Sequence, residues 1–185
     1  MSNNKSLKEV KIAISGKSGC GNTTVSRLIA DALNLCFINF TFRSLAQEKG
    51  LSLNEVINLA AKDDSWDIEV DTRQVKMARD AEGCVLGSRL AIWMLNEADI
   101  KVFLTASPET RVRRIHNREE GSALEEIANF TAFRDKQDHE RYLRIYKIDN
   151  DDYSFADMIV NTDELNAQQI AKKVVVELKR KLSLA

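Results

Sequence analysis

The chain has few of the residues that break or cross-link a polypeptide. One proline and seven glycines in 185 residues exclude collagen-like, linker-rich and turn-dense all-β architectures. The three cysteines, Cys20, Cys36 and Cys84, form no CxxC pair and no zinc-binding spacing. We therefore expect free thiols packed as small apolar groups, as is usual in a reducing cytoplasm.

An excess of charge and a long apolar run are also lacking. The 27 Lys and Arg residues are balanced by 28 Asp and Glu residues, which disfavours a basic nucleic-acid-binding protein. No apolar run approaches the roughly 18 residues that a membrane span needs, and the polar residues 1–11 are unlike a signal peptide. We expect a cytoplasmic protein that binds neither nucleic acids nor membranes.

What the sequence does contain is an alternation of short β-rich segments with longer amphipathic segments. Strands are expected at 9–15, 35–40, 84–86, 100–106 and 158–160, with helices at 23–33, 41–49, from 52, 64–82, 89–96, 109–118, 124–146 and 167–182. This alternation predicts a single α/β domain, a five-stranded parallel sheet flanked by helices. Such sheets bind ligands at the carboxyl ends of their strands.

A glycine-rich segment follows the first expected strand. Its residues are Gly16, Lys17, Ser18, Gly19, Cys20, Gly21, Asn22, Thr23 and Thr24. They fit the P-loop pattern G-x-x-x-x-G-K-[ST], except that Asn22 takes the place of the lysine. The backbone and the helix that follows can still bind ATP phosphates, and Thr23 can ligate Mg²⁺. One lost charge-assisted hydrogen bond costs about 1.5–3 kcal/mol.

Another cation could replace the missing lysine. Lys17 follows the first glycine of the loop, a position that resembles the signature lysine of deviant Walker A loops. Our hypothesis is that Lys17 supplies part of the missing charge, within one chain or across a dimer, although a monomer is expected. The rival hypothesis assigns this charge to arginines of a lid. Whether Cys20 makes the site sensitive to oxidation stays open, because a helix N-terminus lowers the pKa of a thiol whereas burial raises it.

Several segments together resemble nucleoside monophosphate kinases, and above all the short, archaeal-type cytidylate kinases. They include ISGKSGCGNTTVSRLIADAL, FRSLAQEKGLSLNEV, VLGSRLAIWMLNEADIKVFLTA and RDKQDHERYLRIYKIDNDDYSFADMIVNT. The resemblance implies a P-loop kinase fold that transfers phosphate from ATP, with Mg²⁺, to CMP or dCMP. It also implies a core (9–40, 83–117, 147–185), a monophosphate-binding helical insert (about 41–82) and a lid (about 118–146).

The resemblance further implies roles for individual residues. Arg43 and Arg89 are expected to bind the acceptor phosphate, since a guanidinium can hold a phosphate with two hydrogen bonds. Asp71 and Arg73 match a D-x-R element of the insert and are expected to contact the pyrimidine or the ribose.

The expected lid carries Arg134, Asp138 and Arg141. Their i, i+4, i+7 spacing places them on one helix face. The resemblance implies that the two arginines clamp the transferring phosphoryl group and that Asp138 orients them or the base. Three further arginines share a face and are expected to border the lid hinge and the adenine: Arg111, Arg114 and Arg118.

The sequence departs from this family pattern at the expected site. Besides Asn22, the segment 37–41 replaces a usual Ser-Ala-Gly or Asp-Ser-Gly element, and Gly87-Ser88-Arg89 stands where Glu-Gly-Arg is usual. Two alternatives therefore stay open. One is a nucleotide-binding pseudokinase or sensor without turnover, and the other is a kinase of another acceptor, such as UMP or a non-nucleotide alcohol.

The sequence also contains an acidic run and two histidines, which are residue types that can ligate metal ions. The acidic run 149–152 predicts a turn, because it lacks the glycine and the terminal glutamate of a calcium-binding loop. His116 and His139 have no metal-binding spacing and are expected to be exposed helix residues.

Overall fold

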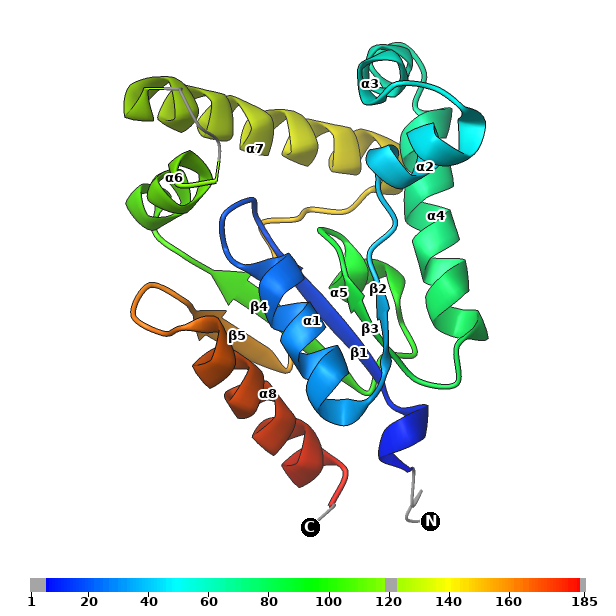
Figure 1. The fold of residues 1–185 in the computed structure, drawn as a ribbon, viewed down its shortest axis with the longest axis vertical. Coiled ribbons are helices and arrows are strands. Elements are labelled where there is room, and N and C mark those ends of the chain that lie inside the picture. Colours follow the sequence, from blue (N-terminus) through cyan, green and yellow to red (C-terminus); the bar gives the residue numbers. More distant parts are fainter. Residues whose placement is uncertain (1–5, 119–122, 184–185) are drawn as a thin grey trace.

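The computed structural model describes residues 6–118 and 123–183. Its sheet contains five strands: β1 (Lys11–Gly16), β2 (Cys36–Ile38), β3 (Cys84–Gly87), β4 (Ile100–Thr105) and β5 (Met158–Asn161). The strand order is β2-β3-β1-β4-β5, and all four neighbouring pairs are parallel. The predicted five-stranded parallel sheet is confirmed (Figure 1).

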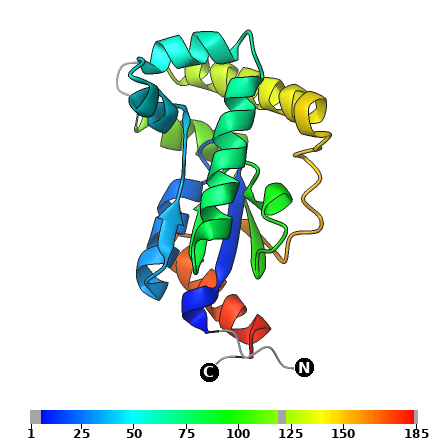
Figure 2. The same cartoon turned by 90° about the vertical axis from the view of Figure 1, so that its right-hand side faces the viewer.

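Helices cover both faces of this sheet. They are α1 (Asn22–Leu33), α2 (Phe42–Lys49), α3 (Leu53–Ala60), α4 (Ser65–Asp80), α5 (Ala91–Met94), α6 (Pro108–His116), α7 (Leu124–Tyr146) and α8 (Ala167–Lys181). α1 and α8 lie on one face, while α4 and α5 lie on the other (Figures 1 and 2). α7 is a single unbroken helix that crosses above the carboxyl ends of the strands, opposite α2 and α3.

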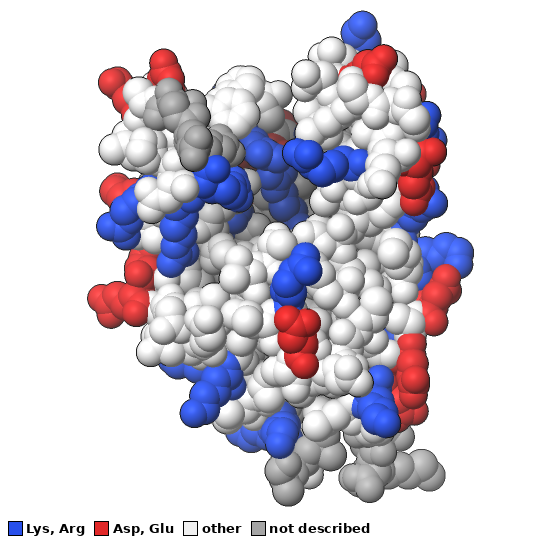
Figure 3. Space-filling view, in the orientation of Figure 1, with Lys and Arg blue, Asp and Glu red and all other residues white. Residues whose placement is uncertain are grey.

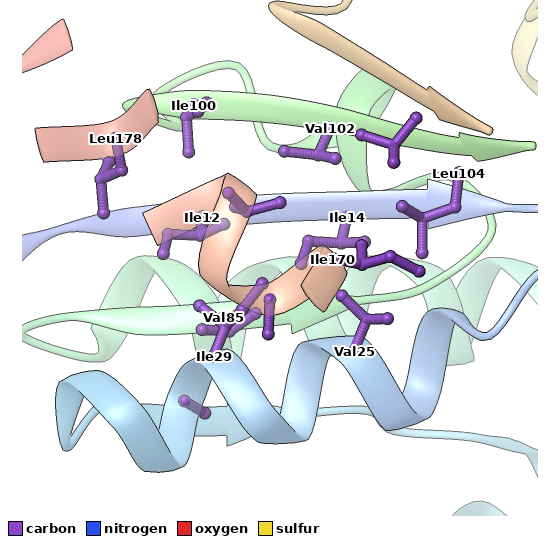
Figure 4. Close-up of a cluster of buried hydrophobic side chains, with 14 of the residues drawn as sticks. Ile12, Ile14, Val25, Ile29, Val85, Ile100, Val102, Leu104, Ile170 and Leu178 are labelled. Carbon is purple, nitrogen blue, oxygen red and sulfur yellow. The ribbon is translucent and has the colours of Figure 1, made fainter. Parts of the chain in front are cut away.

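The central strand explains why both faces need cover. Side chains alternate along a strand, so Ile12 and Ile14 of β1 pack with α1 and α8, whereas Ala13 packs on the opposite side. Figure 4 shows Val25 and Ile29 of α1 in the first of these clusters. β1 is thus buried on both faces, as is typical of the centre of a parallel sheet.

Local signals in the sequence place several helix ends correctly. Gly50 adopts a left-handed backbone with φ 67° and caps α2. Ser52 and Glu55 form the expected capping box at the start of α3, and Pro108 is the first residue of α6.

Other boundaries differ from the prediction. Glu9 belongs to a short 3-10 turn (Leu7–Glu9) that Ser6 caps, so β1 begins two residues later. β2 is an edge strand and pairs over only three residues. α5 spans only four residues, because the apolar pattern at 89–96 reflects burial of Leu90 and Leu95 rather than helical continuation.

No helix within residues 6–118 and 123–183 combines the length and the apolar character that a bilayer span requires.

Candidate active site

A cavity of about 990 Å³ lies at the carboxyl ends of the strands. Its walls come from the loop 16–24, residues 39–42, α4, residues 87–89, α7 and the segment 162–170. The cations that line it are Lys17, Arg89, Arg114, Arg118, Arg134 and Arg141. Figure 3 shows Lys and Arg side chains gathered around this hollow, between the α6–α7 side and the α2–α3 side. Such a site suits an anionic ligand.

The glycine-rich loop has a backbone suited to binding an anion. Gly19 and Gly21 have φ values of 86° and 91°, a conformation that side chains with a Cβ rarely adopt. A Cβ on Gly19 would also lie 2.9 Å from the Cα of Arg111. Gly21 caps the N-terminus of α1, where unpaired N–H groups and the helix dipole attract phosphate.

Asn22 is hydrogen-bonded into the scaffold. Its Nδ2 donates to the carbonyl of Ser88 (3.2 Å), and its Oδ1 accepts from the hydroxyl of Ser26 (3.1 Å). A Cβ on Gly87 would lie 2.6 Å from that hydroxyl. Two departures from the family pattern, Asn22 and Gly87, are therefore physically coupled through Ser26.

Lys17 lines the cavity but is held by an acidic partner. Its Nζ lies 2.6 Å from Oδ1 of Asp151, in the turn that the acidic run predicts. The same turn holds His139, whose Nδ1 lies 2.9 Å from Oδ1 of Asn150. The expectation that His139 is an exposed helix residue is wrong, because it is half-buried against this turn. His139, Asp149 and Asp151 offer clustered donor atoms, and the Lys17 ammonium already neutralises Asp151.

The structure brings Arg89 together with two residues of the expected lid. One Arg89 nitrogen donates to Oγ of Ser18 (2.8 Å), and another lies 2.6 Å from Oδ2 of Asp138. The other oxygen of Asp138 accepts from Arg141 (2.7 Å). Asp138 is buried, so it bridges two guanidinium groups beside the loop. Arg134 also lines the cavity and forms no ion pair with another described residue.

The arginines of α6 divide into two groups. Arg111 is buried, donates to the carbonyl of Ser18 (2.7 Å) and makes a two-bond pair with Asp135 of α7 (2.7 and 2.9 Å). Arg114 donates to the carbonyl of Gly19 (3.2 Å), and with Arg118 it lines the cavity. Arg111 does not line it, and its contacts tie α6 and the loop to α7.

Asp71 faces the cavity from α4. Its two oxygens accept from Gln74 Nε2 (3.0 Å) and from the Tyr146 hydroxyl (2.9 Å). Burial raises the pKa of Asp71 to about 6, against the opposing effect of the Tyr146 hydrogen bond. The ionised form of a buried carboxylate is stabilised by neighbouring hydrogen-bond donors.

Two of the expected substrate-binding residues lie elsewhere. Arg43 is exposed and does not line the cavity. Arg73 does not line the cavity either. It pairs with Glu48 (2.6 Å), and its guanidinium lies over the ring of Phe40 (4.8 Å). Their proposed contacts with substrate stay predictions.

Sequence reasoning missed four residues of this polar network. Asp67, Gln74 and Tyr142 line the cavity, and Tyr146 joins the network through its hydrogen bond to Asp71. Helical spacing could have indicated three of them. Asp67 and Gln74 lie one turn to either side of Asp71, and Tyr142 lies one turn beyond Asp138. Arg141 links both sides, since its Nε lies 3.2 Å from Oδ1 of Asp67.

Thr23 and Cys20 mark the start of α1 and the loop before it. The Thr23 hydroxyl lines the cavity and accepts a long hydrogen bond from Asn39 (3.4 Å). A hydroxyl oxygen beside a phosphate site fits Mg²⁺, which prefers hard oxygen ligands and keeps several waters.

Cys20 is only 2% exposed, and burial raises the pKa of its thiol. Its thiol is therefore protonated, contrary to what a reactive cysteine requires.

Comparisons with known proteins give a consistent result. The model of the cytidylate kinase-like family matches residues 11–164. The "Cytidylate kinase 2" of Borrelia garinii subsp. bavariensis is 40% identical over 93% of this chain and 98% of its own. The "Cytidylate kinase" of Archaeoglobus fulgidus is 34% identical over 92% and 97%. The structure of shikimate kinase from Acinetobacter baumannii matches at TM-score 0.64, with 17% identity over 97% of this chain and 99% of that one, which supports the fold alone.

Proposed function

Because the chain belongs to the cytidylate kinase-like family, we propose that it transfers the γ-phosphoryl group of ATP to a pyrimidine nucleoside monophosphate, CMP or dCMP first. The observation that carries this proposal is the composition of the cavity at the carboxyl ends of the strands. A phosphate-binding loop lies on one wall, the arginines Arg89, Arg134 and Arg141 lie above it, and the polar face of α4 lies opposite. These walls suit two phosphorylated substrates that meet end to end.

The loop and the helix after it hold ATP in this proposal. Backbone N–H groups of residues 16–24 bind the β-phosphate, and the Thr23 hydroxyl ligates Mg²⁺. The metal, when bound, neutralises phosphate charge. Lys17 adds a cation at the loop, provided that its pair with Asp151 (2.6 Å) can open.

The arginines act on the phosphates that react. Arg134 and Arg141 follow the transferring phosphoryl group, while Arg89, together with Arg43 after closure of the insert, binds the acceptor phosphate. Asp138 holds Arg89 and Arg141 at 2.6 and 2.7 Å and so positions them. Catalysis needs no covalent intermediate, because positioning and charge neutralisation account for phosphoryl transfer. Closure of the lid, residues 118–146, excludes the water that would hydrolyse ATP.

The test is a direct assay of phosphoryl transfer. The purified protein is incubated with Mg-ATP and, separately, CMP, dCMP, UMP, AMP or GMP, and the nucleotides are separated. We expect CDP or dCDP above the control without acceptor. If no acceptor yields a diphosphate although ATP still binds, the enzyme proposal fails and a nucleotide-binding pseudokinase replaces it.

The replacement of the P-loop lysine by Asn22 favours the pseudokinase alternative. The relatives, which are named as cytidylate kinases, favour an active enzyme. The Asn22→Lys variant separates a weakened site from a rebuilt one. Since Asn22 is hydrogen-bonded to Ser88 and Ser26, we expect the substitution to lower kcat/KM rather than to raise it. The monomeric state and the cytoplasmic location stay predictions.

A further inference from the structure

One face of α4 carries a row of hydrogen-bond acceptors into the cavity. Asp67, Val70, Asp71 and Gln74 all line it, and their spacing of three, four and seven residues places them on one side of the helix. Three of these four side chains end in acceptor oxygens. A ligand in contact with this face therefore has to offer donors.

Gln74 is the most informative member of this row. It is 2% exposed, and its Oε1 is buried without a hydrogen-bond partner among residues 6–118 and 123–183. Buried polar atoms in proteins are nearly always paired, so this oxygen is the kind of atom that a ligand satisfies.

The orientation of the Gln74 amide is determined by its neighbour. Its Nε2 donates to Oδ1 of Asp71 (3.0 Å), and the other Asp71 oxygen accepts from Tyr146 (2.9 Å). A flipped amide would set Oε1 against the Asp71 oxygen and lose this hydrogen bond. Asp71 thereby fixes Gln74 as an acceptor toward the cavity.

The polarity along α4 indicates which part of a nucleotide reaches Gln74. Asp67 at one end of the row is joined to Arg141 (3.2 Å), and Arg141 is joined through Asp138 to Arg89 (2.7 and 2.6 Å). That end is the phosphate side. Gln74 lies two turns away from Asp67, and Val70 and Phe40 provide apolar surface in the same cavity, which suits a nucleobase.

We infer that Gln74 accepts a hydrogen bond from the exocyclic amine of a cytosine base, and that Asp71 is a positioning residue that prevents the amide from flipping to accept uracil. Cytosine presents an N–H donor where uracil presents a carbonyl oxygen. With the amide locked, uracil would face the Gln74 oxygen without a donor. This inference rests on the proposed function, because it takes a pyrimidine monophosphate as the ligand.

The experiment compares kcat/KM for CMP and UMP in the wild type and three variants. Asp71→Asn keeps the shape of the side chain but can donate or accept, so Gln74 can flip. Gln74→Leu removes the acceptor. Asp80→Asn is the matched control, because Asp80 lies on the exposed side of the same helix, where it pairs with Lys76.

We expect the wild type to prefer CMP by at least about 100-fold, since sites built around a hydrogen bond reject ligands that cannot form it. Asp71→Asn should lower this ratio at least tenfold, mainly through a higher rate with UMP. Gln74→Leu should lower it through a loss with CMP, and Asp80→Asn should leave it unchanged. Structural damage alone would lower both rates together.

The possible failures can be told apart. If the wild type phosphorylates no monophosphate, the proposed function fails, and CMP and UMP binding by calorimetry tests the inference in its place. If the wild type is active but the ratio, or the difference in binding, is unchanged in Asp71→Asn and Gln74→Leu, the inference is overturned and the proposed function stands. A ratio lost in Gln74→Leu but kept in Asp71→Asn overturns the locking role.

Discussion

At the scale of single residues, the central question is which cation stands in for the P-loop lysine. Asn22 carries no charge and its amide is used in the scaffold. Lys17 is in the loop but pairs with Asp151 at 2.6 Å, and Arg89 donates to Ser18 of the same loop at 2.8 Å. Because Lys17 and Arg89 have different partners, mutations can test the contribution of each cation separately.

The first prediction concerns ATP affinity. If Lys17 binds a phosphate, Lys17→Ala should weaken ATP binding about 10- to 100-fold, the equivalent of one charge-assisted hydrogen bond. Asp151→Asn, which frees Lys17, should strengthen ATP binding. Calorimetric titration with ATP and no acceptor measures both variants. Unchanged affinity in Lys17→Ala would exclude this role and shift it to Arg89.

The second prediction concerns Asp71 and pH. Burial raises its folded-state pKa to about 6, above the unfolded value near 3.9. Between these values the native state keeps a proton that the unfolded state loses, so the contribution of Asp71 to stability falls as pH rises and is fully unfavourable above about pH 6. The shift in pKa corresponds to about 3 kcal/mol of stability. The polar groups that face the Asp71 carboxyl are those of Tyr146, Asp67, Arg141 and Gln74.

Asp71→Asn should remove this dependence. Its free energy of unfolding, relative to the wild type, should rise between pH 4 and pH 7, and urea unfolding across that range measures the difference. A difference that does not vary with pH would show that Asp71 titrates normally in the folded protein.

At the scale of elements, ion pairs fix the position of α7 against its neighbours. Arg111 joins α6 to Asp135 of α7, while Arg144 pairs with Asp64 at the start of α4 (2.6 Å). α7 therefore bridges the core and the expected insert across the mouth of the cavity. The pair with Arg111 is the better buried of the two, with exposed fractions of 8% and 20% against 62% and 34%.

The third prediction concerns the ion pair between Arg111 and Asp135. Asp135→Ala leaves the buried Arg111 without its acidic partner, and removing one member of a buried pair costs about 3–5 kcal/mol. We expect a loss near the lower end, because the Ser18 carbonyl still accepts from Arg111. Glu140→Ala on the exposed side of α7 is the control and should change the free energy of unfolding by less than about 0.5 kcal/mol. Equal effects of the two variants in urea unfolding would contradict the proposed role.

At the scale of the whole molecule, the cavity lies between parts that extend from the core. α3 on one side and α7 on the other carry exposed apolar residues at its wall, with Ile57 46% exposed and Phe133 60% exposed. Closure of the two sides would bury these residues. We therefore retain the division into core, insert (about 41–82) and lid (about 118–146) as a proposal about motion.

The fourth prediction tests that division. Small-angle scattering should give a radius of gyration near the roughly 16 Å typical of a chain of this length. ATP and CMP together should reduce it, and CMP alone should reduce it less, because closure needs both substrates. An unchanged radius with saturating substrates would indicate a rigid cleft.

The sequence by itself determined the local structure. Alternating strands and helices, the Gly50 end of α2, the Ser52 capping box and the glycine-rich loop all depend on residues within a few positions of one another. The physical reason is that backbone conformation and capping are short-range, so a pattern in the chain carries them directly.

Only the tertiary structure decided the partners. Residues far apart in the sequence form the pairs of Lys17 with Asp151, of Arg111 with Asp135 and of Arg73 with Glu48. Packing also leaves the Gln74 oxygen without a partner in the described part of the chain. These contacts depend on how helices pack around a shared cavity, and the identity of a residue does not reveal which neighbour its charge or amide meets. The sequence therefore indicated a phosphate-binding kinase site, whereas the residues that we propose to select the base depend on the packing of α4 against α7.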